Sequence, residues 1–196
     1  MFRGDGVRAF VVVRQFVGGR GQPSSPYKTF YICSPKLRTP QRFEQGAPFT
    51  RESLSGFKIF GDRLGFVIYT EGVQSGSDTE VGWVDFRIVR VRIGQINASE
   101  GLQNESEEEP GLPRVPADNV HYAIAGDGTV AVLGEGGDPT EWEVCLLPVK
   151  LHSLGPPQPL FIAKPGQEGL DPHSLAITET SVTWRTRNGQ PASAPR

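Results

Sequence analysis

The sequence is poor in the residues and patterns that build helices. It contains a single methionine, and no stretch keeps apolar residues at positions i, i+3, i+4 and i+7 over three turns, the spacing of an amphipathic helix. Glycine and proline, which interrupt helices, contribute 24 and 17 of the 196 residues. The shortage of helix signals and the abundance of turn formers together predict an all-β chain.

The sequence lacks the usual signatures of several functional classes. No window approaches the roughly 20 apolar residues of a membrane-spanning helix, and the first residues do not form a signal peptide. The net charge is −2, with acidic and basic residues mixed, so the basic face of nucleic-acid-binding proteins is missing. We therefore expect neither a membrane span nor a nucleic-acid partner. Taken literally, the start predicts a cytoplasmic protein; as part of a longer precursor the chain would be exported.

Potential metal ligands and nucleophiles are few and scattered. Cys33 and Cys145 each lie in an apolar, strand-like segment, so we predict free thiols that pair only if their strands are neighbours. His121, His152 and His173 are not placed at the spacing of metal ligands. We predict no catalytic residue, no metal site and no cofactor.

Two further motifs resemble functional sites only loosely. Residues 72–76 depart from the Gly-x-Ser-x-Gly spacing of a hydrolase elbow, and no helix follows them. The run of glutamates within residues 105–109 points its side chains in different directions, unlike the ligands of a calcium site. We interpret residues 96–118 as an acidic, proline-containing loop. The lack of a recognisable catalytic or metal-binding motif favours a non-catalytic role.

Strand patterns, by contrast, recur along the whole chain. Glycine or acid–glycine turns at residues 61–63 and 126–128, and a polar turn at residues 178–180, each join two short apolar segments and predict hairpins. Residues 83–93 alternate so regularly that we predict one long strand there. The other predicted strands cover residues 7–17, 27–33, 57–60, 64–70, 121–125, 129–133, 141–151, 160–163, 174–177 and 181–185.

These strands group into a repeat. Residues 61–70, 126–135 and 178–187 each open with a turn that has an acid at its second position and then enter a strand. A strand led by Trp83 or Trp142 follows the first two windows. Because one such sheet cannot bury both of its faces, we predict sheets stacked like the blades of a partial or open β-propeller, with a β-sandwich as the alternative. The predicted units, in one β-repeat domain over residues 1–190, are residues 7–45, 53–95, 119–151 and 160–190, followed by a tail at 191–196 without core-forming residues.

The last unit carries a resemblance. Residues 169–178 read Gly-Leu-Asp-Pro-His-Ser-Leu-Ala-Ile-Thr, residues 181–184 Ser-Val-Thr-Trp, and residues 188–193 Asn-Gly-Gln-Pro-Ala-Ser. This stretch resembles the C-terminal part of uncharacterised bacterial β-propeller-like repeat proteins, related to TolB-like and WD40-like propellers, many of which are exported. The resemblance implies a fold but no activity. Because the first unit is incomplete, the chain holds about three and a half units, fewer than the roughly four to eight blades of an ordinary closed propeller.

Two functional hypotheses follow. The first is a propeller-like scaffold or protein-interaction module that binds a protein partner or associates with itself. The alternative is a carbohydrate-binding or carbohydrate-active propeller, in which exposed tryptophans stack on sugars and paired carboxylates flank a pocket. Trp83, Trp142 and Trp184 all lie in predicted strands, where buried tryptophans anchor a core. Whether these tryptophans are exposed or buried therefore discriminates between the two functional hypotheses.

Overall fold

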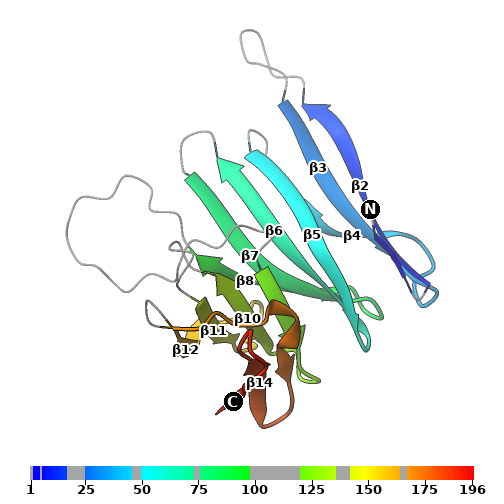
Figure 1. Cartoon of the computed structure of the whole chain (residues 1–196). Coiled ribbons are helices and arrows are strands. Elements are labelled where there is room, and N and C mark those ends of the chain that lie inside the picture. Colours follow the sequence, from blue (N-terminus) through cyan, green and yellow to red (C-terminus); the bar gives the residue numbers. More distant parts are fainter. Residues whose placement is uncertain are drawn as a thin grey trace.

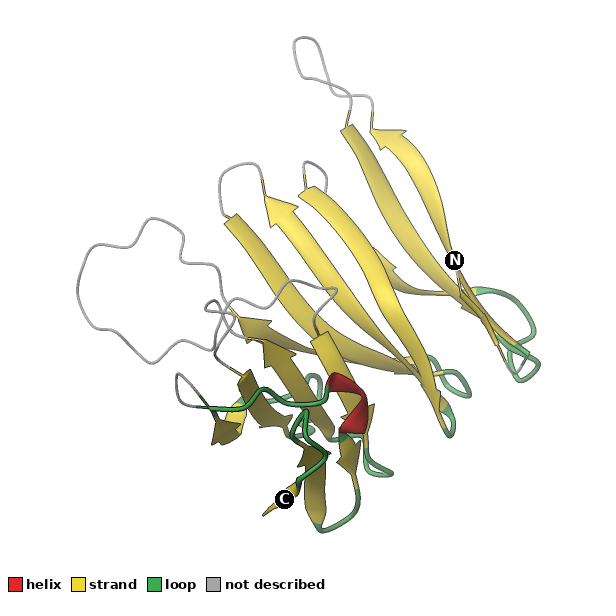
Figure 2. Ribbon diagram, in the orientation of Figure 1, coloured by secondary structure: helices red, strands yellow, loops and turns green. Residues whose placement is uncertain are grey.

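The structure is a computed structural model of the whole chain. It describes residues 2–4, 6–16, 25–45, 50–72, 76–97, 120–135, 142–163 and 167–196. The described residues include no helix that is both long enough and apolar enough to cross a membrane. A short 3-10 helix, η2 (Pro172–Ser174), is drawn red in Figure 2, and strands dominate the rest.

In the described parts of the chain, fifteen strands form four antiparallel sheets, which confirms the predicted all-β class. In each sheet the strands lie side by side in the order of the chain. The first sheet contains β1 (Phe2–Gly4), β2 (Val7–Phe16), β3 (Ser25–Cys33) and β4 (Gln41–Gln45). The second contains β5 (Thr50–Phe60), β6 (Arg63–Gly72), β7 (Gly76–Asp85) and β8 (Arg90–Asn97). The third contains β9 (Val120–Ile124), β10 (Val130–Glu135), β11 (Trp142–Leu147) and β12 (Gln158–Ile162), and the fourth β13 (Ala176–Ile177), β14 (Ser181–Arg185) and β15 (Pro191–Pro195).

The sheets pack face to face in a row (Figure 1), with a hydrophobic core between each neighbouring pair. Ile32 and Phe43 of the first sheet meet Phe66 of the second. The other two interfaces bury alternate side chains in the same way, as expected when strands present every second residue to one face. The row has four layers, so a two-layer sandwich does not describe it. Over the described ranges the sheets do not close into a ring or barrel.

The three predicted hairpins form. β5 and β6 are joined at Gly61, whose φ of +59° suits the first central position of a two-residue hairpin turn. β9 and β10 are joined through Gly128, with φ +95°. In the β13–β14 turn the Thr178 hydroxyl accepts hydrogen bonds from the backbone N–H groups of Thr180 and Ser181. Local turn chemistry therefore predicts these three connections correctly.

Three parts of the sequence-based prediction differ from the structure. Residues 83–93 form no single strand, because a turn at residues 86–89, with Val89 at φ +52°, separates β7 from β8. Residues 160–163, placed in the fourth unit, belong mostly to β12, which pairs with β11 of the third sheet. Residues 191–196 are no loose tail, since β15 pairs with β14 along its whole length.

Two further differences concern strands that the sequence does not predict and the start of the predicted acidic loop. β1 and β4, the edge strands of the first sheet, were not predicted from the sequence. Of the predicted acidic loop, Ile96 and Asn97 lie in β8, and the run at residues 105–109 lies outside the described residues.

Candidate functional site

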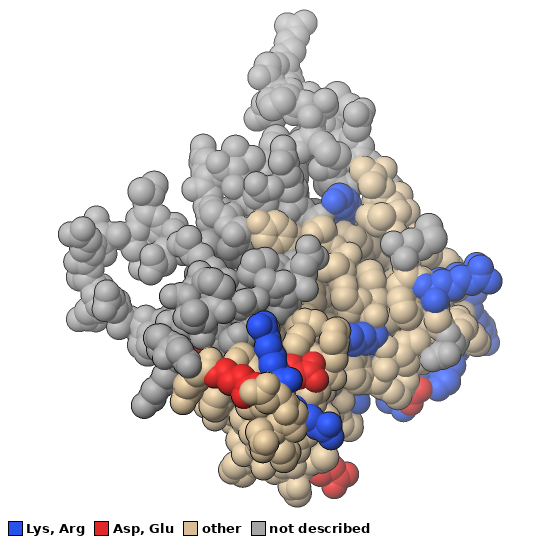
Figure 3. All heavy atoms as spheres, in the orientation of Figure 1, with Lys and Arg blue, Asp and Glu red and all other residues tan. Residues whose placement is uncertain are grey.

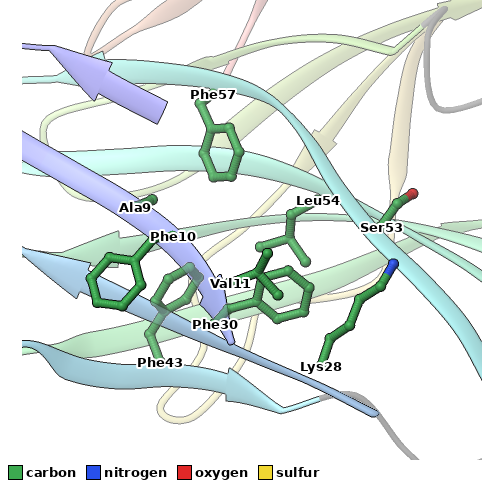
Figure 4. A pocket seen from close by; sticks show the side chains of 9 residues that line it. All are labelled: Ala9, Phe10, Val11, Lys28, Phe30, Phe43, Ser53, Leu54 and Phe57. Carbon is green, nitrogen blue, oxygen red and sulfur yellow. The ribbon is translucent and has the colours of Figure 1, made fainter. Parts of the chain in front are cut away.

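A pocket opens between the first and second sheets (Figure 4). Its volume is about 150 Å³. Four strands supply its walls. β2, β3 and β4 provide one side and β5 the other, through Ala9, Phe10, Val11, Lys28, Phe30, Phe43, Ser53, Leu54 and Phe57.

Among the described residues, the lining is apolar apart from Lys28 and Ser53. Figure 4 shows Lys28 and Ser53 on one side of the view and Phe43 on the other. The same face of β2 continues outward from the pocket with Val11 and Val13, which are 40% and 56% exposed. An apolar hollow with a few polar groups at its edge is the usual composition of a small-molecule site.

Charged groups tie the two sheets together away from this pocket. The Lys36 ammonium, in the loop after β3, bonds the Asp62 carboxylate in the β5–β6 turn at 2.7 Å. This hydrogen bond, together with the Arg87 charge, holds the pKa of Asp62 below its ordinary value against the opposing effect of burial. The Ser34 hydroxyl also donates to the Phe86 carbonyl at 3.1 Å. These contacts hold the first and second sheets together. The Asp62 carboxylate already has cationic partners in Lys36 and Arg87.

The outward face of the first sheet is aromatic and basic. Val7 and Ala9 of β2 are buried against the second sheet, so their neighbours Arg8 and Phe10 point to the opposite face. On that face the Phe10 and Tyr31 rings stack, with centroids 5.5 Å apart and planes 13° apart. Arg3 and Arg42 flank the pair, because they lie opposite Arg8 and Tyr31 in register.

Figure 3 shows Lys and Arg side chains on the side of the molecule where Figure 1 places the first sheet. We call Arg3, Arg8, Phe10, Tyr31 and Arg42 the first-sheet face.

The outward face of the fourth sheet has a different character. Val182 and Trp184 are buried against the third sheet, which turns Thr183 and Arg185 outward. In register with Thr183 and Arg185 lie Ser193 and Pro191 of β15. Small polar side chains, proline and the single cation of Arg185 thus cover this end of the stack.

The structure brings two histidines together that are far apart in the sequence. The rings of His121 and His173 make an edge-to-face contact with centroids 5.2 Å apart. Burial lowers the pKa of His121, and the nearby charges of Lys58 and His173 lower it further, while Asp171 opposes them. His152 is exposed elsewhere. Sequence spacing could not reveal this pair, because the contact joins β9 to the turn before the fourth sheet. Within the described parts of the chain, no three histidine, cysteine or acidic side chains are grouped to hold a metal ion.

Two of the three tryptophans are core residues. Trp83 and Trp184 are only 3% and 4% exposed, which leaves neither ring free to stack on a sugar. Trp142 belongs to β11, but its side chain lies outside the described residues.

The two cysteines are free, and the second sheet separates their strands. Cys145 is buried in the core between the second and third sheets. Burial raises the pKa of its thiol to about 12, and Glu143 adds to this effect. Cys33 is half-buried on β3. A thiol with so high a pKa is a poor nucleophile at neutral pH.

Comparison of the chain with protein-family models, with curated protein sequences and with solved structures finds no significant match. The features of this chain that bear on function are therefore the pocket and the two end faces.

Proposed function

We propose that this protein is a non-catalytic, propeller-like scaffold that binds an acidic protein partner through the first-sheet face. The observation that carries the proposal is the contrast between the two ends of the stack. One end presents stacked aromatic rings among Arg3, Arg8 and Arg42, and the other presents serine, threonine, proline and a single arginine, Arg185. In stacked-repeat proteins, a polar outer face is typical of a cap that ends the array.

The arrangement of the strands supports the propeller-like part of the proposal. Each sheet is a meander in chain order, as propeller blades are. β9, the first strand of the third sheet, contacts both β5 and β13, the first strands of the sheets on either side. First strands that converge in this way resemble the inner strands around a propeller axis.

The composition of the first-sheet face indicates the chemistry of the partner. Tyrosine, phenylalanine and arginine are the residue types enriched in protein interfaces. Arg3 and Arg8 lie directly opposite each other, and like charges in such positions repel. A partner with carboxylates around an apolar centre would neutralise these charges and cover the Phe10–Tyr31 pair.

Site-specific photo-crosslinking tests the proposal. A photoreactive phenylalanine analogue replaces Tyr31 in one chain and Thr183 on the opposite end in a second chain. Both are expressed in the protein's own organism. We expect a discrete adduct with one acidic protein at position 31 and none at position 183. The purified pair should bind more weakly as salt rises, and Arg8→Glu should weaken it at least tenfold, whereas Arg185→Glu should not.

Three outcomes would contradict the proposal. Equal adducts at both positions would show that the two ends of the stack do not differ in partner binding. The absence of any adduct at position 31 would show that no partner binds the first-sheet face. An adduct with a second copy of the chain would mean that the first-sheet face mediates self-association and does not bind an acidic partner. Light scattering of the purified protein would detect this association.

A further inference from the structure

We infer that this protein associates with itself head to tail, by inserting the side chain of Leu151 into the pocket between the first and second sheets of a second copy. The pocket lies between two sheets, whereas the first-sheet face points away from the second sheet. The inference therefore does not rest on the acidic partner proposed above.

The inserted side chain lies at the tip of a tight turn between β11 and β12. We call residues 148–155 the Leu151 loop. Within it, the backbone N–H of Lys150 donates a 2.9 Å hydrogen bond to the Ser153 carbonyl. This bond places Leu151 at the outer end of the turn, where the residue is 78% exposed. The loop thus presents a large apolar side chain to solvent.

The Leu151 loop is fixed to the second sheet. The Arg92 guanidinium, on β8, donates hydrogen bonds to the carbonyls of Lys150 and Leu151. The Leu154 N–H donates to the Ile93 carbonyl at 3.0 Å, and the Leu154 side chain is buried. Because these contacts already order the loop, little conformational freedom is lost when Leu151 binds a partner.

The pocket has the size of a leucine side chain. Its volume is about 150 Å³, and a cavity of roughly this volume is left when one buried leucine is shortened to alanine. The described lining offers apolar carbon on both sides, from Phe30 and Phe43 of the first sheet and from Leu54 and Phe57 of the second (Figure 4). A branched aliphatic side chain entering the pocket would exchange water for these contacts.

The exposed apolar side chains gather at the same two places. In the described part of the chain, six large apolar residues are exposed: Val11, Val13, Ile88, Val149, Leu151 and Ile162. Val11 lines the pocket, and Val13 follows it on the same face of β2. Val149 precedes Leu151 in the loop. One contact between the loop and the pocket would therefore cover four of the six, as expected of apolar surface that serves an interface.

The contact must join two different copies. The pocket is lined by β5, and the Leu151 loop is held on β8, which is the opposite edge strand of the same sheet. The loop therefore cannot fill the pocket of its own chain. Because the loop and the pocket are different surfaces, each pair of chains leaves one loop and one pocket unoccupied, and further copies can add at both ends.

Sedimentation velocity of the purified full chain over a wide range of concentration tests the inference. For a contact smaller than a standard protein interface, we expect a dissociation constant on the order of 100 µM, with masses that grow beyond the dimer. Leu151→Ser should weaken the association roughly tenfold or more, because a leucine side chain is no longer buried. Ile88→Ser, which removes a 58% exposed side chain outside both surfaces, is the matched control and should change nothing.

A variant on the pocket side completes the test. Val11→Arg places a large cation at the rim and should prevent association, whereas Ile88→Arg should not. Leu151→Ser chains keep their pocket and Val11→Arg chains keep their loop. Neither variant should associate alone, and a mixture of the two should form a one-to-one dimer that grows no further. Circular dichroism and thermal unfolding establish that each variant is folded.

A wild-type chain that stays monomeric at millimolar concentration would overturn the inference. Association that survives Leu151→Ser or Val11→Arg would also overturn it, as would a mixture of these two variants that fails to dimerise.

The two proposals of self-association and of an acidic partner can fail separately. Added salt and Arg8→Glu should leave self-association unchanged, because apolar contacts drive it, whereas both should weaken binding of the acidic partner. Leu151→Ser should leave the adduct at position 31 intact. Self-association that is lost in Arg8→Glu would place the contact on the first-sheet face and refute the role of the Leu151 loop.

Discussion

The indole N–H of Trp83, on β7, donates a 2.8 Å hydrogen bond to the carbonyl of Gly128, in the turn between β9 and β10. The two residues belong to different sheets and are 45 positions apart. The Arg63 guanidinium lies over the same indole, 4.9 Å from its centre. Trp83 thus joins the second and third sheets by packing and by a buried hydrogen bond.

Trp184 provides a natural comparison, because its indole N–H is buried without a hydrogen-bond partner in the described structure. Both Trp83→Phe and Trp184→Phe remove part of a buried ring. Only Trp83→Phe also removes a hydrogen bond and strands a buried carbonyl. We therefore expect Trp83→Phe to lower the free energy of unfolding by about 1–2 kcal/mol more than Trp184→Phe. Urea denaturation measures both values, and equal losses would mean that the bond contributes nothing.

Gly128 is constrained from two sides. Its φ of +95° disfavours any residue with a Cβ, and a Cβ at this position would lie 2.6 Å from Cζ2 of Trp83. Gly128→Ala should therefore destabilise the protein by about 3 kcal/mol. Gly126→Ala is the control, since a Cβ there meets nothing within 4 Å. Thermal unfolding should separate the two variants, and similar midpoints would argue against this close approach.

The two thiols should differ in reactivity. Cys145 is buried and the pKa of its thiol is raised to about 12, whereas Cys33 is half-buried on an outer sheet. At pH 8 a thiol reagent should label one cysteine per folded chain, and Cys33→Ser should abolish this labelling. In denaturant both cysteines should react. Rapid labelling of Cys145 in the folded Cys33→Ser chain would contradict its position in the core.

Asp85 should make stability depend on pH in the acid range. Arg87 bonds both carboxylate oxygens of Asp85, at 3.1 and 2.7 Å, and these bonds lower the pKa of Asp85 against the opposing effect of burial. A carboxyl whose pKa is lower in the folded state than its ordinary 3.8 stabilises the fold above that pH. This stabilisation is lost as the pH falls through the lowered pKa.

Asp85→Asn should therefore cost about 1 kcal/mol at pH 7, and this difference should shrink toward zero as the pH falls below the lowered pKa. Chemical denaturation at several pH values measures it. A difference that stays constant from pH 7 down to pH 2 would show that the charge of Asp85 is not its cause.

The C-terminal strand should contribute to stability. Ala192 and Ala194 of β15 pack against the core that contains Trp184, and Arg196 forms an ion pair with Asp127 of the third sheet. Deleting residues 191–196 exposes part of this core and should cost about 2 kcal/mol. Arg196→Ala removes the ion pair and the hydrogen bonds of the guanidinium to Thr129 and Thr178 but leaves the strand in place, so it should cost less than the truncation, about 1 kcal/mol. A truncated chain as stable as the full one would show that residues 191–196 contribute nothing to stability, as expected of a tail.

Sequence patterns predicted well where short-range chemistry decides. β14 spans the predicted residues 181–185, and the β5–β6, β9–β10 and β13–β14 hairpins form at the predicted turns. They predicted poorly where a regular alternation continues through a turn. Residues 83–93 keep their alternation although the chain reverses at residues 86–89, and no glycine marks the positive φ of Val89. β15, with its sequence Pro-Ala-Ser-Ala-Pro, carries no strand signal of its own and is a strand because β14 pairs with it.

The candidate sites were beyond the reach of the sequence. The pocket combines Val11, Lys28 and Leu54 from three strands, and neither its volume nor its charge follows from any local pattern. The contact between His121 and His173 depends on how the third and fourth sheets pack.

By itself, the sequence determined that this chain is all-β and where several of its hairpins turn, because backbone preference and alternation act over a few neighbouring residues. Only the tertiary structure decided which face of each sheet is buried, which tryptophans belong to the core, and where aromatic and basic side chains gather. Those outcomes depend on contacts between sheets distant in the chain, and each such contact is selected by the packing of the whole stack.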